Sequence, residues 1–268
     1  MTTLPDQTSG SLPLRLKRAV FDLLPRRARL PVRVQWLRAG KHLEPEIHDM
    51  ARLVPKGGTA VDIGANHGIY SYFMVRHFDR VVAFEPQPAC VETLTSWAGP
   101  RVEVRPVALS DRAGESTLSI PVAHGVAMTG YARLDAAGAA DSGSELLQVP
   151  VERLDDQGLT EVRLMKVDVE GHELEVLRGG EQLLRRDNPV LLVEIEQRHL
   201  GDSRSVSEVI EYLSGLGYGA YFRAGDSDWT DVAGFDPSQH QDVGALGTRD
   251  YVSMFLFTPG GRPPSVAG

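Results

Sequence analysis

Apolar residues occur in this chain either as short continuous runs or at helical spacing. The short runs predict buried strands at residues 59–63, 81–85, 102–107, 163–168, 190–195, 217–222 and 252–257. The helical spacing predicts helices between most of these strands, near residues 69–77, 88–97, 172–184 and 205–215. Strands that alternate with helices are typical of a parallel sheet covered on both faces, so we expect an α/β fold with a doubly wound sheet.

Two segments interrupt this alternation. Residues 111–150 contain one further predicted strand, at 115–122, followed by a Gly-, Ala- and Ser-rich stretch from Ala123 to Glu145 that predicts a long loop. Residues 225–249 predict a second loop, which contains Trp229, Phe235 and His240. Long loops in a compact domain commonly carry function, so we expect one of the two to form a substrate pocket.

The segment before the first strand has a different character. Residues 1–11 are polar, and we expect them to be disordered. Residues 14–24 and 43–54 have the pattern of helices, and Pro25 and Pro31 should keep any helix of the basic segment short. We therefore divide the chain into an N-terminal arm, residues 1–42, and a single domain, residues 43–268.

Charge separates the same two parts. Of the net charge of −8 over 268 residues, residues 1–42 hold nine Lys or Arg and two Asp, or +7, and the remainder carries −15. The acidic domain argues against nucleic acid as the substrate. The basic residues of the arm lie between apolar ones. This pattern favours either a helix that binds a membrane surface or a partner protein, or an arm that packs against the acidic domain. These residues are Arg15, Lys17, Arg18, Arg26, Arg27, Arg29 and Arg33.

Composition narrows the class of protein. Hydrophobic residues make up 42% and charged residues 24% of the chain, which is typical of a soluble globular protein. The single cysteine, Cys90, excludes a disulfide framework and fits a reducing compartment. No apolar run approaches the roughly 18–20 residues that span a bilayer, and the N-terminus does not have the pattern of a secretory signal. We expect a cytoplasmic protein.

The segment TAVDIGANHGIYS, residues 59–71, predicts a nucleotide site. It reads as a strand, a glycine loop and a helix, and Gly64 and Gly68 let a ligand approach the backbone. A second strand ends at Glu85, 21 residues after Gly64, where nucleotide-binding folds place a carboxylate for ribose hydroxyls. A dinucleotide fingerprint requires G-x-G-x-x-G, whereas here Asn66 replaces the second glycine and Asp62 precedes the loop.

A second group of polar residues follows the strand at 163–168. Asp168, Glu170 and His172 come at its carboxyl end, which should face the same crevice as Gly64. They are candidate catalytic residues, and His172 is the natural general base. Asp168 and Glu194, at the ends of two neighbouring strands, are candidate ligands of Mg²⁺. The alternative interpretation of Glu170 and His172 is helix capping.

Taken together, five blocks of sequence resemble the FkbM-type methyltransferases, within class I of the S-adenosylmethionine-dependent enzymes. The resemblance covers roughly residues 59–196. The blocks are Val61 to Gly68, Ala83 to Pro86, Val107 to Asp111, Lys166 to Glu173 with Leu177 to Gly179, and Pro189 to Ile195.

The resemblance implies a Rossmann-like sheet of seven strands in which the last strand lies antiparallel beside the fifth. It also implies transfer of a methyl group from S-adenosylmethionine to a hydroxyl of a sugar or a glycosylated or polyketide-like metabolite. The residues implied to bind the cofactor are Asp62, Gly64, Asn66 and Gly68 along its methionine and ribose part, Glu85 at the ribose, and Ala108, Leu109 and Ser110 beside the adenine.

Two other classes of protein remain as alternatives. An NAD-dependent oxidoreductase would keep the nucleotide site, but Asn66 counts against its fingerprint. A non-catalytic nucleotide-binding module would keep the fold alone. The set of Asp62, Glu85, Asp168 and Glu170 favours an enzyme over such a module.

Overall fold

The computed structural model describes residues 23–40, 42–123, 126–135, 143–201, 203–225 and 227–261. Residues 1–11, which we expect to be disordered, lie outside these ranges. Nearly all of the predicted helix 14–24 and His124 of the predicted loop also lie outside them. So do Gly125 and Gly138 of the predicted loop.

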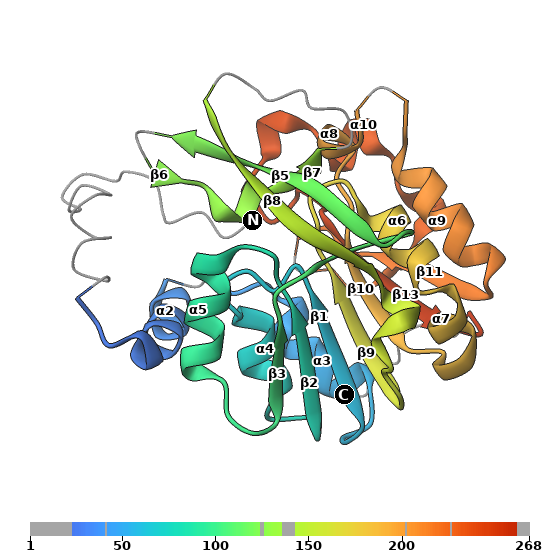
Figure 1. Ribbon diagram of the computed structural model, residues 1–268. Helices are drawn as coiled ribbons and strands as arrows, with labels where there is room; N and C mark the ends of the chain where they lie inside the picture. Colours follow the sequence, from blue (N-terminus) through green and yellow to red (C-terminus); the bar gives the residue numbers. More distant parts are fainter. Residues whose placement is uncertain are drawn as a thin grey trace.

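The main sheet has eight strands in the order β12-β11-β13-β10-β9-β1-β2-β3 (Figure 1). Each of the seven predicted strands is present, within two residues at each end. The eighth is a two-residue edge strand, β12, so the expected count of seven is corrected to eight. The bounds are β1 Thr59–Ile63, β2 Arg80–Phe84, β3 Val102–Arg105, β9 Val162–Val167, β10 Val190–Glu194, β11 Tyr218–Phe222, β12 Thr230–Asp231 and β13 Met254–Pro259.

Strand directions agree with the resemblance. β3, β2, β1, β9 and β10 are parallel neighbours, whereas β13 pairs antiparallel with both β10 and β11. The last strand therefore lies antiparallel beside the fifth, as the family resemblance implied.

Helices cover both faces of the sheet because alternate residues of its strands are apolar on each side. Val61 and Ile63 of β1 belong to the core under α6, α7 and α9, and Ala60 belongs to the core under α3 and α4. The predicted helix 172–184 is divided at Gly180 into α6 and α7. The bounds are α3 Glu46–Leu53, α4 Ile69–Met74, α5 Pro88–Trp97, α6 Glu173–Gly179, α7 Glu181–Asp187, α8 Gln197–Leu200, α9 Val206–Gly215 and α10 Pro237–His240.

A second sheet is built around the further strand predicted at 115–122, which is β5. The short strands β6 and β7 and the start of β8 lie within the stretch predicted as a long loop, so that prediction was wrong in part. The order of this sheet is β4-β8-β5-β6, and β7 pairs with β5. Figure 1 shows β5 and β8 as long strands lying across one end of the main sheet. Leu118, Ile120, Val149 and Val151 form its small core, which explains why the segment folds. The bounds are β4 Ala108–Ser110, β5 Gly114–Ala123, β6 Val126–Ala127, β7 Arg133–Asp135 and β8 Ser144–Arg153.

The second predicted loop, residues 225–249, packs on the main sheet. It contains β12, α10 and two short 3₁₀ helices, Val232–Gly234 and Val243–Ala245. The rings of Phe235 and His240 stack with centroids 5.5 Å apart, and both contact Phe222. These aromatic side chains are therefore packing residues.

The basic segment contributes one long helix, α2, Arg26–Ala39. Leu30 and Val34 are fully buried and pack with Tyr72 of α4, and Arg26 forms an ion pair with Glu92 of α5. Pro31 lies inside the helix, so the expectation that prolines would keep it short was wrong. Burial of the apolar face of α2 compensates for the hydrogen bond that Pro31 cannot donate.

The Leu30→Ala variant should lose about 3–5 kcal/mol of unfolding free energy, because Leu30 is 0% exposed and its removal leaves a cavity against α4 and α5. Urea unfolding measures this. The matched control is Arg27→Ala on the exposed side of α2, expected within about 0.5 kcal/mol of the parent. Equal stability of the two variants would mean that α2 does not belong to the folded unit.

Within the part of the chain that the structure describes, no helix is long and apolar enough to cross a bilayer.

Candidate functional site

A cleft with about 570 Å³ of empty space, part of which is open solvent, lies between the carboxyl ends of the main strands and the second sheet. Its walls come from the loops after β1, β2 and β9, from Val107 to Leu109, and from β5, β7 and residues 129–132. Of the predicted site residues, Gly64, Asn66, Glu85, Ala108, Leu109, Asp168 and Glu170 line it.

The glycine loop is shaped by two close approaches. Gly64 has φ +70°, and a Cβ there would stand 1.8 Å from the carbonyl oxygen of Asp168. Gly68 has φ +87° at the start of α4, and a Cβ there would stand 2.2 Å from Leu94 Cδ2. Only glycine fits at either position without moving its neighbours. The loops after β1 and β9 therefore meet backbone to backbone beside the cavity.

Glu85 follows β2 and is 2% exposed. The backbone N–H groups of Asn66 and Gln87 donate to its two carboxylate oxygens, at 2.7 and 2.8 Å. Burial raises the pKa of Glu85 to about 7, although these two hydrogen bonds act in the opposite direction. Each carboxylate oxygen keeps a further lone pair, so the group can still accept hydrogen bonds from a diol.

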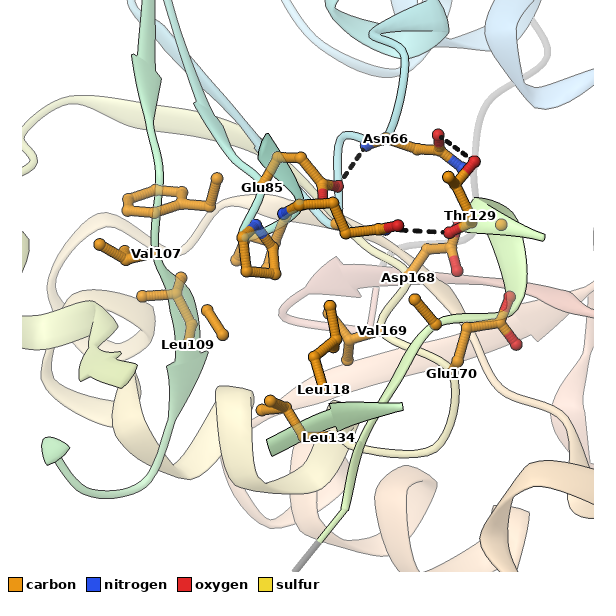
Figure 2. Close-up of a pocket in the computed structure, with 18 residues that line it drawn as sticks. Asn66, Glu85, Val107, Leu109, Leu118, Thr129, Leu134, Asp168, Val169 and Glu170 are labelled. Atoms are coloured by element: carbon orange, nitrogen blue, oxygen red, sulfur yellow. Dashed lines mark hydrogen bonds between the residues drawn. The ribbon is translucent and has the colours of Figure 1, made fainter. Parts of the chain in front are cut away.

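The two ends of the cavity differ in polarity (Figure 2). Val107 and Leu109 lie at one end and the carboxylates of Asp168 and Glu170 at the other, while Leu118 and Leu134 line one side of the space between them and Glu85 lies on the opposite side. Such a gradient suits a ligand with an apolar ring at one end and charged groups at the other.

Asp168 at the polar end is held by a buried lysine. Lys166 Nζ donates to Asp168 Oδ2 at 2.8 Å and to the carbonyl oxygen of Gly64 at 3.2 Å, and it lies 4.0 Å from Asp62 Oδ1. Burial by itself would lower the pKa of Lys166, but the charges of Asp168 and Asp62 outweigh it, so the pKa is raised. Lys166 is therefore a fixed cation that ties β9 to the glycine loop.

Asp62 does not line the cavity. It is 0% exposed, and its Oδ2 accepts hydrogen bonds from the backbone N–H and the hydroxyl of Ser71, at 2.9 and 2.6 Å. Gly68 is likewise outside the lining. Both residues instead shape the glycine loop and the start of α4. Asp62 anchors α4 through Ser71, and Gly68 is the residue immediately before α4.

Ser110 and His172 lie together outside this cavity. His172 Nε2 is 2.8 Å from Ser110 Oγ, and the two residues line a second depression with Arg112 and Glu115. Burial lowers the pKa of His172. The structure thus separates His172 from Asp168 and Glu170, with which the sequence had grouped it.

Glu170 lines the polar end, and its Oε2 lies 2.8 Å from His199 Nδ1. Burial raises the pKa of Glu170, and the hydrogen bond with His199 lowers it. The sequence did not single out His199. Its position shortly after Glu194, the residue that ends β10, was the available signal.

The residues do not fit the predicted magnesium site. Among the described residues, no group of three or more His, Cys, Asp or Glu side chains is arranged to hold a metal ion. Asp168 is instead paired with Lys166 at 2.8 Å, and burial raises the pKa of Glu194 well above its usual value, with the charge of Asp168 adding to the effect. A carboxyl whose ionised form is disfavoured by burial, beside an Asp–Lys pair, is a poor donor set for Mg²⁺.

The second sheet supplies lining residues that the sequence did not single out. Leu118 and Leu134 come from β5 and β7, and Thr129 follows β6. Thr129 accepts a hydrogen bond from Gln87 Nε2 through its carbonyl oxygen, at 3.0 Å, and this bond closes the cavity over Glu85. The alternation of apolar residues at 118 and 120 and at 149 and 151 was a strand signal in the sequence.

A pH dependence of stability should follow from Glu173. Burial raises its pKa to about 7, and its Oε1 accepts a hydrogen bond from Gly171 N–H at 3.0 Å. Because the folded state binds this proton more tightly than the unfolded chain does, stability is full below about pH 4 and falls as pH rises to about 7. Urea unfolding between pH 5 and 8 should show this decline, and Glu173→Gln should make it shallower. An unchanged slope would contradict the assignment. Glu85 contributes a decline of the same sign.

The fold and the cavity define the class: a Rossmann-like α/β protein with a nucleotide-type pocket at the carboxyl ends of its strands. A family model described as the methyltransferase FkbM domain matches residues 62–219. The chain belongs to this family, which confirms the resemblance seen in the sequence.

The individual proteins to which the chain is similar share little sequence identity with it. The chain is similar to methyltransferase sdnD of Sordaria araneosa, with 30% identity over 172 residues that cover 50% of this chain and 64% of that protein. It is also similar to the structure of methyltransferase FkbM from Methylobacillus flagellatus KT, at 16% identity and a TM-score of 0.48, over 90% of this chain and 57% of that one. A TehB-like SAM-dependent methyltransferase from Corynebacterium glutamicum has 12% identity and a TM-score of 0.42, over 87% and 97%. The chain thus spans less than two thirds of the first two.

Proposed function

We propose that this protein transfers a methyl group from S-adenosylmethionine to a hydroxyl oxygen of a small polar metabolite, such as a sugar or a glycosylated or polyketide-like compound. The observation that carries this proposal is the position of Glu85 in a cavity that is apolar at one end and carboxylate-lined at the other. Membership of a methyltransferase family supports it independently.

The cavity fits the parts of this cofactor in order. Val107, Leu109, Leu118 and Leu134 would take the adenine, and Ala108 lies in the same wall. Glu85 would accept both ribose hydroxyls, because one carboxylate offers acceptors for two donors. Gly64 leaves bare backbone beside the ribose and methionine part, next to Asn66, since no Cβ fits there.

Asp168 adds negative charge where the cofactor carries positive charge. The cofactor supplies a methyl group on a sulfonium, and its methionine part bears an ammonium. Asp168 is fixed in place by Lys166 at 2.8 Å and would orient this cationic part.

Glu170 is the residue that we assign to the acceptor. An alcohol is a weak nucleophile at neutral pH, so a base must remove its proton as the oxygen attacks. Glu170 lines the polar end and has a raised pKa, which suits a proton acceptor. His172 lies beside Ser110, outside this cavity, so we give it no part in the transfer.

Replacing Glu85 by glutamine should weaken binding of S-adenosylhomocysteine by about 10- to 150-fold at pH 8, where the parent carboxyl is ionised. The loss corresponds to one charge-assisted hydrogen bond of about 1.5–3 kcal/mol. Calorimetric titration measures it. The matched control is Glu208→Gln on the exposed side of α9, which should bind like the parent. If the folded Glu85→Gln protein binds S-adenosylhomocysteine as tightly as the parent does, Glu85 does not bind the ribose.

The acceptor can be sought with a cofactor whose methyl group carries deuterium. Purified protein, labelled cofactor and a small-molecule extract should yield a product that bears the label, detected by mass spectrometry. Heat-inactivated protein is the control. Transfer to a nitrogen or carbon atom would disprove O-methylation, and a protein that binds the cofactor but labels nothing in polar extracts would argue against a polar metabolite.

A further inference from the structure

The turn after β9 holds Glu170 in a strained conformation. Glu170 has φ +56° and Gly171 has φ +100°, both in the left-handed region. A residue with a side chain occupies this region only at a conformational cost, so its surroundings must impose it. Here Gly171 donates its N–H to Glu173 Oε1 at 3.0 Å and accepts from Arg204 Nη1 at 3.4 Å. The turn is thus fixed from both sides, with Glu170 at the cavity.

His199 is fixed against the same turn. It lies in α8, and a Cβ on Gly171 would stand 2.5 Å from its carbonyl oxygen, so the two segments are in direct contact. Its Nδ1 lies 2.8 Å from Glu170 Oε2, and the two side chains are only 14% and 15% exposed. This contact joins residues 29 positions apart in the sequence.

A second carboxylate near His199 is already engaged. Glu196 Oε1 is 3.9 Å from His199 Nδ1, beyond hydrogen-bonding distance. Arg198 donates to both oxygens of Glu196, at 2.7 and 2.9 Å, and the hydroxyl of Tyr251 donates to Oε2 at 2.5 Å. Arg198 and Tyr251 therefore satisfy Glu196, which leaves Glu170 as the hydrogen-bonding partner of His199.

We propose that Glu170 and His199 form a carboxylate–imidazole dyad that accepts the proton of the acceptor hydroxyl, a mechanism that rests on the proposed function. Glu170 is the catalytic base, and His199 is a positioning residue that donates its Nδ1–H to Glu170 Oε2. This bond favours the ionised form of the buried carboxylate and leaves Oε1 for the substrate. As the acceptor oxygen forms its bond to the methyl carbon, the carbon–sulfur bond breaks and its electron pair stays on sulfur. The hydroxyl proton passes to Glu170.

Nitrogen-15 NMR of the imidazole rings tests the dyad without any acceptor. At pH 8, His199 should carry its proton on Nδ1, and Glu170→Ala should move it to Nε2, the tautomer that free imidazole side chains prefer. The His199→Asn spectrum assigns the signal. The matched control is Glu161→Ala, which alters an exposed glutamate that also has positive φ. An unprotonated Nδ1 in the parent, or a tautomer unaffected by Glu170→Ala, would overturn the proposal.

The rate of methyl transfer then shows whether His199 positions Glu170 for catalysis or only stabilises the fold. The probe is the extract fraction that takes up label from the parent protein. His199→Ala should lower kcat at least about tenfold with an unchanged KM for the cofactor. His199→Asn should recover most of the rate, because its amide can still donate to Glu170. The control is His48→Ala on the exposed side of α3, which should act like the parent. Parent-like kcat in His199→Ala would refute the dyad, whereas failure of the parent to bind S-adenosylhomocysteine would refute the proposed function instead.

Discussion

The Gly64→Ala variant should lose at least about 4 kcal/mol of unfolding free energy and bind no S-adenosylhomocysteine. Its methyl group would stand 1.8 Å from the carbonyl oxygen of Asp168, which belongs to the backbone and cannot rotate away. The left-handed φ adds a further cost of about 1–2 kcal/mol. The clash is relieved only if the loops after β1 and β9 move apart, and residues of both loops line the cavity. Urea unfolding and calorimetric titration measure the two effects.

Gly158→Ala is the matched control for this prediction. Gly158 has a similar φ of +64°, but a Cβ there meets nothing within 4 Å. Its variant should show only the conformational cost and should bind the cofactor product normally. If the two variants lose the same stability, the contact between Gly64 and Asp168 is not what constrains the loop.

Glu170→Gln should lower kcat by about 10²–10⁴ while leaving S-adenosylhomocysteine binding intact. A glutamine amide keeps the size of the side chain but cannot accept the hydroxyl proton, and loss of a general base has this magnitude. Single-turnover transfer of labelled methyl to the identified acceptor measures the chemical step. Glu161→Gln serves as the control, because that glutamate also has positive φ (+53°) but is exposed and far from the cavity lining. A parent-like rate in Glu170→Gln would place the base elsewhere.

The main sheet could be predicted because its strands are buried on both faces. Their mainly apolar runs, such as Thr59 to Ile63 and Val190 to Glu194, clearly predict strands. The glycine loop between the first strand and the helix after it is a further motif that predicts a nucleotide site. Glu85, Asp168 and Glu170 followed from the rule that ligands bind at the carboxyl ends of such strands. The structure brings all three to one cavity.

Only one long strand of the second sheet, β5, was predicted, for a physical reason. The apolar residues of β8 alternate with exposed polar ones, and a Gly- and Ala-rich stretch lies between β5 and β8. His172 is the N-cap of α6 and contacts Ser110 instead of lining the cavity with Asp168, because β4, which carries Ser110, lies beside α6 in the fold. The contact between Glu170 and His199 depends on the path of the chain through β10 and α8, which no local pattern specifies.

Calorimetric titration of the purified protein with S-adenosylhomocysteine, and separately with NAD, shows directly whether the cavity is a site for S-adenosylmethionine. We expect saturable binding of S-adenosylhomocysteine at pH 8, weaker binding by Glu85→Gln, and no binding of NAD. A folded protein that binds NAD and not S-adenosylhomocysteine would contradict this expectation in favour of an oxidoreductase, and one that binds neither would contradict the assignment of the cavity as a cofactor site.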